Sequence, residues 1–320
     1  MPWINNRTMS PMRFVEPLRR PLPRESASNG CFETMRAYGG QIFRLEAHLD
    51  RLYASAKFLG ARAPSDRTAL GRQLINALER SRLREAVVRV ALFPRPFGSP
   101  SGSSLGLAQG VAHGDHATRR GQAQQATRAT EAFPSIVVQR AIRPPASAYR
   151  RGIRIAVVPA RKFSVGSIDP QAKYSARLGS VLAVADAQLR GVDEALFMDA
   201  MGSVTESTAS NVGIISDGVI LTPPCWLGLL EGITRDVLFE LAQRLAISIE
   251  EVPLTRHDLY NAEEAFLTST LKEVLAVTWI DGRQIGAGRP GPVTLQLHRA
   301  FHELVREELS GRSHKITRHM

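Results

Sequence analysis

The chain has 320 residues, of which 43% are hydrophobic, and a formal net charge of +11 at pH 7. This length is enough for two domains, each with a core of its own. No apolar run approaches the roughly 20 residues of a membrane span, and the first residues lack the apolar segment of a signal peptide. We therefore expect a soluble protein of the cytoplasm with no membrane partner.

The positive charge raises the question of a nucleic-acid partner. The arginines, however, occur from end to end and often stand beside Glu or Asp. The sequence contains no RNA-binding aromatic pattern and no zinc-finger spacing. We expect no nucleic-acid partner, while a basic face that attracts anionic small substrates remains compatible with the composition.

The cysteines and histidines give no sign of a metal centre. Cys31 and Cys225 lie far apart and outside any metal-binding spacing, which is typical of free thiols in a reducing compartment. His298 and His302 form an i, i+4 pair, but metal sites need more ligands than two. We interpret the pair as part of a solvated helix face and predict no metal.

The first half of the chain alternates strands and helices. The predicted elements are a strand at 3–15, a hairpin at 30–45, helices at 45–59 and 66–81, and a strand at 86–93. The hairpin turns at Gly39 and Gly40. The last strand is apolar except for Arg89, an interruption that indicates a special role. Residues 98–132 are rich in Gly, Ser, Gln and Arg, which predicts a mobile insertion.

The second half is predicted as α+β around a strand meander. A Pro- and Gly-punctuated segment, 141–152, is interpreted as an interdomain linker. The predicted elements are strands at 134–140, 153–159, 194–199, 203–207, 211–216, 219–224 and 264–269, helices from after Lys173 to Leu189, at 233–246, 271–277 and 292–309, and a hairpin at 279–286. Residues 311–320 form a basic tail that we expect to be frayed.

Lys173 stands out chemically, because it is one of five lysines in a chain with thirty-six arginines. Arginine could supply surface charge anywhere, whereas only lysine has a pKa low enough to lose its proton and form a Schiff base. It lies between a Pro-containing loop and a long apolar-periodic segment. We interpret it as the amine that holds an aldehyde cofactor.

Other residues have a physical relation to such a cofactor. Glu206 lies among small residues that would desolvate it, and a carboxylate there could keep a pyridine nitrogen protonated. Gly232 precedes Ile233 and Thr234 at a predicted helix start, where unpaired amides suit a phosphate. Thr270 and Glu273 have the spacing of a capping box at another predicted helix start. Arg51 would add a bidentate positive charge. Each residue alone is more often a cap or a solvated side chain.

These blocks resemble the fold type IV pyridoxal-phosphate enzymes, the class IV aminotransferases. The likeness covers roughly 30–95 and 150–308 and rests on several blocks in the family's order: RAYGGQIFRLEAHLDRLYASAK, SIDPQAKYSARLGSVLA, DEALFMDAMGSVTESTASNVGII, LLEGITRDVLFELA and HDLYNAEEAFLTSTLKEV with DGRQIGAGRPGPVT. The resemblance implies an α+β fold with a small N-terminal α/β domain (1–140) and a larger C-terminal pseudo-barrel domain (153–310). It also implies a homodimer.

The resemblance also implies roles for individual residues. Lys173 matches the Schiff-base lysine, Glu206 the glutamate at the pyridine nitrogen and Arg51 the phosphate arginine. The remaining phosphate positions are matched by Ile233, Thr234 and Thr270. On the substrate side we expect Phe32, Arg89 and Arg177, of which Arg89 resembles an active-site arginine of the branched-chain group.

The substrate is the least determined part of this interpretation. The HDLY and DGRQIG blocks favour transamination of a branched-chain amino acid with a 2-oxo acid, in ping-pong fashion through the Lys173 Schiff base. Arg177 replaces a frequent tyrosine in a KxxxRL arrangement similar to aminodeoxychorismate lyase, which makes pyruvate elimination the runner-up. The sequence also leaves open a D-amino acid aminotransferase and a polyanion-binding protein without turnover.

Overall fold

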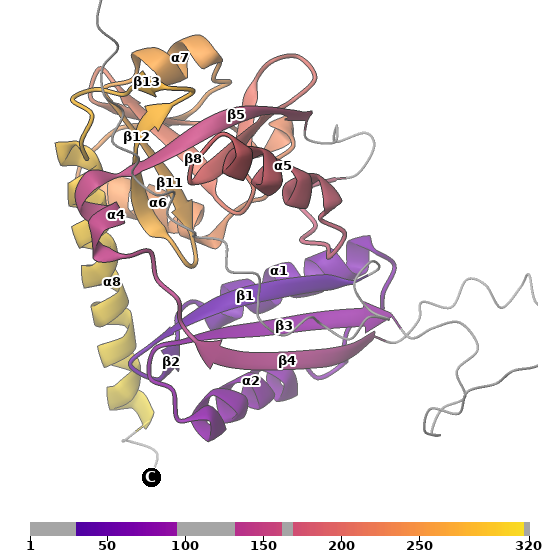
Figure 1. Cartoon of the computed structure of the whole chain (residues 1–320). Helices are drawn as coiled ribbons and strands as arrows, with labels where there is room; N and C mark the ends of the chain where they lie inside the picture. The colour runs from indigo at the N-terminus through magenta and orange to yellow at the C-terminus, as the bar shows by residue number, and fades with distance from the viewer. Residues whose placement is uncertain (1–29, 95–131, 162–168, 317–320) are drawn as a thin grey trace, which may run out of the picture.

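The computed structural model describes residues 30–94, 132–161 and 169–316 (Figure 1). The predicted strand at 3–15 lies outside these residues, and so does the predicted insertion 98–132 except for its last residue. The described residues form a smaller N-terminal sheet and a larger C-terminal one (Figure 1).

The N-terminal part is an antiparallel sheet with the strand order β2-β1-β3-β4 and two helices. Its elements are β1 (Cys31–Tyr38), β2 (Gln41–Ile42), α1 (Leu45–Phe58), α2 (Arg67–Ser81), β3 (Ala86–Pro94) and β4 (Ala132–Arg140). The hairpin turn is confirmed, since Gly39 and Gly40 both have positive φ, as a two-residue turn between strands requires. Helix α2 begins at Asp66, whose side chain accepts a 2.7 Å hydrogen bond from the amide of Ala69.

Successive side chains of a strand point to opposite faces, so the two faces of this sheet carry different residues. Met35 and Val88 share one buried cluster with Leu49 of α1 and Leu74 of α2, so both helices cover the same face. Burial of such a side chain contributes about 1.5–3 kcal/mol to the stability of the fold. On the opposite face, Phe32 of β1 and Ala91 and Phe93 of β3 form a separate buried cluster. Arg89 follows the same alternation and lies on that second face.

The C-terminal part is a closed, mixed sheet. The ring runs β8-β11-β12-β5-β6-β7 and closes where β7 pairs with β8 again, at Glu206 and Asn211. Its strands are β5 (Ile153–Arg161), β6 (Glu194–Met198), β7 (Val204–Ser207), β8 (Asn211–Ser216), β11 (Glu264–Ser269) and β12 (Glu273–Ile280). The strands β9 (Val219–Thr222), β10 (Ile249–Glu251) and β13 (Arg283–Gln284) extend it. The pseudo-barrel expected from the resemblance is confirmed.

Helices cover the outside of the barrel. They are α4 (Ala146–Arg151), α5 (Leu178–Leu189), α6 (Ile233–Arg244), α7 (Arg256–Asn261) and α8 (Pro292–Ile316), and a 3-10 turn spans Cys225–Leu227. Leu196, Leu267 and Leu275 fill the interior. Helices α6 and α8 pack on the outer face around Phe266, and this cluster includes Tyr38 from the N-terminal sheet. The two parts therefore share a buried apolar contact.

Several predicted boundaries differ from the structure. The helix predicted at 271–277 is wrong, because residues 273–280 form strand β12, antiparallel to β11. Helix α5 begins at Leu178 and not directly after Lys173. The linker 141–152 contains the short helix α4, and α8 continues to Ile316, into the stretch predicted as a frayed tail. The sequence patterns did not predict strand β10 and helix α7.

Among the described residues, no helix has the length and apolarity to span a membrane.

Candidate functional site

Lys173 lies between β5 and α5, where its backbone is tied to the N-terminal sheet and helix α1. Its carbonyl accepts a 3.0 Å hydrogen bond from the amide of Phe32, and its amide donates a 3.0 Å hydrogen bond to Ser55 Oγ. The side chain is half-buried, with Nζ 5.2 Å from the centre of the Phe32 ring. The lysine is therefore held at the junction of the two parts of the fold.

The surroundings of Lys173 favour its neutral amine. Burial and then the positive charge of Arg51 lower the pKa of Lys173 to about 8 from the model-compound value of 10.5. The charge of Arg177 adds to this effect, whereas the carboxylates of Glu33 and Glu206 oppose it. At pH 7 about one tenth of the side chains are then neutral, far more than for a solvated lysine. This amine is therefore prepared for nucleophilic attack on a carbonyl group.

Arg51 bridges helix α1 and the entrance to helix α6. Its Nε and Nη2 donate hydrogen bonds of 2.7 and 2.9 Å to the carboxylate of Glu33. Its Nη1 donates a 2.5 Å hydrogen bond to the carbonyl of Glu231, directly before Gly232. A largely buried guanidinium thus stands at the positive end of a helix.

The start of helix α6 has no side-chain cap and could accept an anion. Gly232 is the N-cap and provides no side-chain hydrogen bond to the first-turn amides, including those of Ile233 and Thr234. A Cβ at Gly232 would lie 2.0 Å from Asn211 Oδ1, so no other residue fits there without displacement. Asn211 is itself held by a 2.8 Å hydrogen bond from Nδ2 to the Leu230 carbonyl.

Glu206 lies on β7, beside the same segment. The side chain is buried, and its Oε2 accepts a 3.0 Å hydrogen bond from the amide of Leu230. Its charge acts on both Lys173 and Arg51, so the three groups form one electrostatic cluster. The structure thus brings together the amine, the carboxylate and the helix start that local sequence patterns had indicated separately.

Thr270 occupies a setting different from the predicted one. It lies in the turn between β11 and β12, and the capping box predicted with Glu273 does not exist, because no helix begins there. Two residues earlier, Thr268 pairs with Asn211, the residue that touches Gly232. Thr270 therefore stays on the same edge of the barrel as helix α6.

Three cations surround the ring of Phe32. The guanidinium carbons of Arg89 and Arg177 lie 4.4 and 5.9 Å from the ring centre, and Lys173 Nζ lies at 5.2 Å. Burial and the charge of Arg177 lower the pKa of Arg89. Within the described residues, Nε of Arg89 is buried without a hydrogen-bond partner. Arg177 donates to the carbonyl of Thr208. An anionic group beside Phe32 would relieve this repulsion.

Sequence reasoning missed Glu33, His48 and Asn211. Glu33 is fully buried and also lies 2.8 Å from His48 Nδ1. Burial alone would raise the pKa of Glu33, but the charge of Arg51 and the hydrogen bonds from His48 and Arg51 hold it far below its usual range. Glu33 is a charged residue in a mostly apolar strand. The same signal had indicated a special role for Arg89 and could have identified Glu33.

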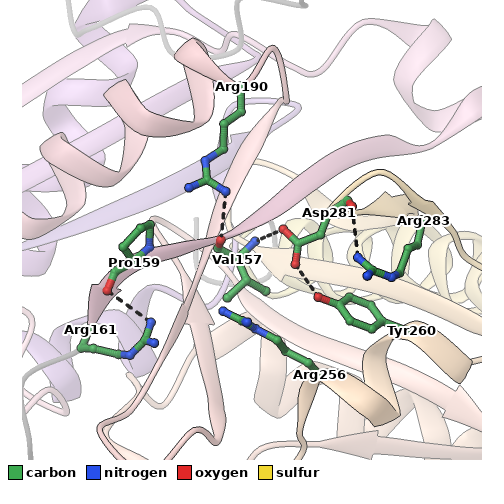
Figure 2. Close-up of a pocket in the computed structure, with 8 residues that line it drawn as sticks. All are labelled: Val157, Pro159, Arg161, Arg190, Arg256, Tyr260, Asp281 and Arg283. Atoms are coloured by element: carbon green, nitrogen blue, oxygen red, sulfur yellow. Dashed lines mark hydrogen bonds between the residues drawn. The ribbon is translucent and has the colours of Figure 1, made fainter.

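A pocket lies elsewhere on the barrel, away from the Lys173 cluster. Figure 2 shows a pocket whose walls include Arg161, Arg190, Arg256 and Arg283, with Asp281 among them. The Asp281 carboxylate accepts hydrogen bonds from the amide of Val157 at 2.9 Å and from Tyr260 Oη at 2.7 Å. None of the predicted site residues lines this pocket, and no lysine is among its lining residues. The Lys173 cluster, which contains an amine, therefore suits reaction with a carbonyl group better than this pocket does.

Comparisons with known proteins agree on one protein family. Residues 30–280 match the family described as amino-transferase class IV. The branched-chain-amino-acid aminotransferase of Pseudomonas aeruginosa is 35% identical over 281 residues, which cover 86% of this chain and 84% of the relative.

Solved structures agree with this match. The branched-chain aminotransferase of Thermoproteus uzoniensis with norvaline superposes with a TM-score of 0.72 at 29% identity, covering 86% of this chain and 85% of that one. The branched-chain amino acid aminotransferase of Thermobaculum terrenum in its PLP form gives a TM-score of 0.74 at 25% identity, covering 88% and 86%.

Proposed function

The chain belongs to the amino-transferase class IV family, and from that premise we propose that it transfers the amino group of a branched-chain amino acid to a 2-oxo acid with pyridoxal 5'-phosphate. The observation that carries the proposal is the cluster of Lys173, Arg51 and Glu206 around the start of helix α6. The solved structures of one relative in its PLP form and of another with pyridoxamine 5'-phosphate support the cofactor.

The chemistry of these residues fits the cofactor. The amine of Lys173, with its lowered pKa, suits the aldehyde. Arg51 and the first amides of α6 suit the phosphate, because the N-cap Gly232 has no side chain that could occupy those amides. Ile233, Thr234 and Thr270 would complete this phosphate site. Glu206 would face the pyridine nitrogen with its negative charge.

Individual residues of this chain would have separate roles in the transamination. When bound, pyridoxal phosphate supplies the electron sink that weakens the Cα–H bond of an attached amino acid. Lys173 Nζ, as a free amine, would accept that proton from the substrate Cα. Glu206 stabilises a proton on the ring nitrogen. Because the amino group stays on the enzyme between the two half-reactions, the kinetics are ping-pong.

The substrate would lie beside Phe32. The ring offers an apolar surface for an aliphatic side chain, and Arg89 and Arg177 offer positive charge for a carboxylate of the substrate. The names of the relatives support a branched-chain donor. The two arginines within 6 Å of Phe32 also keep aminodeoxychorismate, an anionic substrate, as the runner-up through elimination of pyruvate.

We propose a homodimer formed through helix α5. The apolar side chains Leu178, Val181, Leu182 and Leu189 are 59–88% exposed in the single chain. A run of apolar residues on one helix is a common mark of a protein interface. Light scattering of the purified protein would test the assembly, and a monomer at micromolar concentration would contradict it.

The function is tested by spectroscopy and by substrate assays. Purified protein with pyridoxal phosphate is expected to show a visible band that borohydride removes, with the label on Lys173. Transfer from Leu, Ile and Val to 2-oxoglutarate is measured beside transfer from D-Ala and pyruvate release from aminodeoxychorismate. Pyruvate release with no transfer from Leu, Ile or Val would replace the aminotransferase by the lyase, and absence of the band would reject both.

A further inference from the structure

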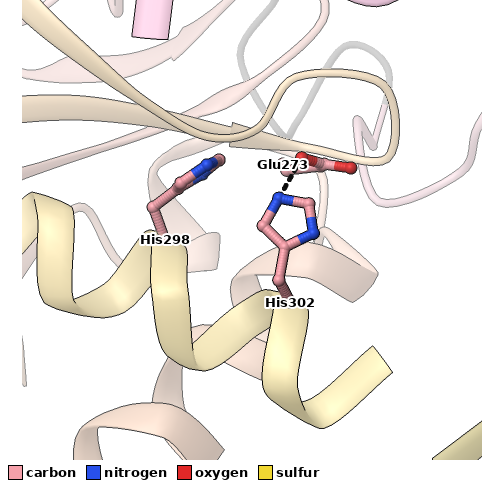
Figure 3. Close-up of side chains that lie close together, drawn as sticks. All are labelled: Glu273, His298 and His302. Carbon is pink, nitrogen blue, oxygen red and sulfur yellow. Dashed lines mark ion pairs between the residues drawn. The ribbon is translucent and has the colours of Figure 1, made fainter. Parts of the chain in front are cut away.

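Three potential metal ligands meet on the outer side of the barrel, away from Lys173. Figure 3 shows Glu273 from the start of β12 above His298 and His302, which lie one turn apart on helix α8. One ligand atom from each residue can be chosen so that all three lie within 4.8 Å of one another. Glu273 is buried, while both histidines are half-buried and open a path to solvent.

Each ligand is oriented by a further hydrogen bond. Tyr38 Oη donates to Glu273 Oε1 at 2.9 Å, which directs the other carboxylate oxygen toward His302 Nε2 at 3.0 Å. His298 Nδ1 lies 3.1 Å from the Val274 carbonyl and donates to it, so its Nε2 carries a lone pair. Hydrogen bonds from ligands to carbonyls and to other side chains are the usual support of metal sites.

The residue types of the three side chains suit metal binding. One carboxylate and two imidazoles form a common ligand set for zinc.

We propose that Glu273, His298 and His302 form a binding site for a divalent transition-metal ion, with zinc as the best fit. Zinc holds nitrogen and oxygen ligands at about 2.0–2.2 Å, which places the ligand atoms of a tetrahedral site about 3.3–3.6 Å apart. The Glu273–His302 pair at 3.0 Å would therefore open slightly, and ligand atoms as far apart as 4.8 Å would close by about an ångström. The ion takes the place of the proton between His302 and Glu273, and that proton leaves to solvent. A water molecule completes the tetrahedron.

The site would join three separate parts of the chain. His298 and His302 belong to the C-terminal helix, Glu273 to the β11–β12 hairpin, and Tyr38 to the end of strand β1. Glu273 has a φ of 58°, a strained value for a residue with a side chain, at the point where the turn after β11 enters β12. A bound ion would hold helix α8 against the barrel and raise the stability of the whole protein.

The test uses the full-length protein, with its cofactor, after removal of metals with a chelator. Cobalt(II) is the probe, since its visible absorption reports tetrahedral nitrogen and oxygen ligands, and calorimetry with zinc gives the stoichiometry. We expect one ion per chain, displacement of cobalt by zinc, and a rise of about 5 °C in the unfolding midpoint at a hundredfold excess over Kd. No tetrahedral cobalt spectrum, or no zinc binding, would overturn the proposal.

Histidine variants distinguish zinc binding at this site from weak zinc binding elsewhere on the protein surface. His298→Ala and His302→Ala should each weaken zinc binding by on the order of 100-fold, because each removes a direct ligand. His257→Ala is the control, since that histidine is 86% exposed and lies on α7. Equal affinity in all three variants would overturn the proposal. His298→Gln serves if the alanine variant fails to fold, and unchanged affinity there counts against the site as well.

Discussion

Arg51 holds the buried carboxylate of Glu33 with two hydrogen bonds, of 2.7 and 2.9 Å. The pair fixes the guanidinium, and only Nη1 extends to the carbonyl before helix α6. Arg51 is therefore positioned by the protein before any phosphate arrives. A preformed positive group binds an anion without the entropy cost of ordering a long side chain.

Glu33→Gln tests this arrangement. The change removes the charge that pairs with Arg51 and His48, and breaking such a buried pair costs about 3–5 kcal/mol of stability. The pKa of Glu33 is lowered on folding, so its stabilisation is present above about pH 4 and is lost as the pH falls further. The difference in the free energy of unfolding between wild type and variant should shrink between pH 7 and pH 3. Glu46→Gln, on the exposed face of α1, should change it by less than about 1 kcal/mol.

The lowered pKa of Lys173 predicts how cofactor capture depends on pH. Only the neutral amine attacks an aldehyde, so the rate at which the visible band forms in apoenzyme should rise through about pH 8 and level off above it. Stopped-flow mixing with pyridoxal phosphate measures this profile. A midpoint near the ordinary lysine value would contradict the proposed surroundings, and Lys173→Arg should show no band at any pH.

Gly232→Ala should weaken cofactor binding with little effect on the fold elsewhere. The new Cβ would collide with Asn211 Oδ1, so either the helix start or Asn211 must move. We expect a loss of affinity of about 10–100-fold, the equivalent of one or two charge-assisted hydrogen bonds. Equilibrium dialysis gives the affinity. Gly71→Ala is the matched control, because its Cβ would meet only an ordinary contact at 3.5 Å inside helix α2.

Arg177→Gln should act on anionic substrates more than on branched-chain ones. The guanidinium lies 5.9 Å from the Phe32 ring and repels Arg89, so its charge is available for a carboxylate there. We expect KM for 2-oxoglutarate to rise by about 10-fold or more, while the half-reaction with leucine changes much less. Arg140→Gln, at the exposed end of β4, should leave both unchanged. An equal loss for both substrates would place Arg177 in a structural role.

Lys272→Met should destabilise the barrel. Lys272 Nζ pairs with the buried carboxylate of Glu194 and lies 3.2 Å from Ser210 Oγ. Without the amine, Glu194 remains as an uncompensated charge, which costs about 3 kcal/mol. The unfolding midpoint reports this loss, with Lys57→Met at an exposed position of helix α1 as control. If both variants unfold at the wild-type temperature, the buried pair contributes nothing.

The residue types at two hairpin turns made these turns predictable from the sequence. The pairs Asp217-Gly218 and Asp281-Gly282 have positive φ at both positions and join antiparallel strands, as their residue types indicate. The spacing of Thr270 and Glu273 misled, because a capping-box pattern can also arise in a tight turn. The apolar run after Glu273 suits a helix or a buried strand equally, and its pairing with β11 decides between them.

The sequence singled out Lys173 because lysine is rare in this chain, and Glu206 and Gly232 because of their local surroundings. The structure brings these residues together, and their roles toward a cofactor are proposals. Glu33 and His48 could not be singled out, since their role depends on a partner from another element. Likewise, His298 and His302 form an ordinary helix pair until Glu273, from a distant strand, is placed above them.

The position of β5 between β6 and β12 has a consequence for synthesis of the chain. The N-terminal sheet is complete when the ribosome has reached Arg140, so it can fold early. Strand β5 follows at Ile153, but the strand that pairs with its other side begins only at Glu273. Until then the nascent barrel exposes an open strand edge, a surface that favours aggregation and chaperone binding. Folding of the barrel should therefore be slow and should end with release of the C-terminal segment.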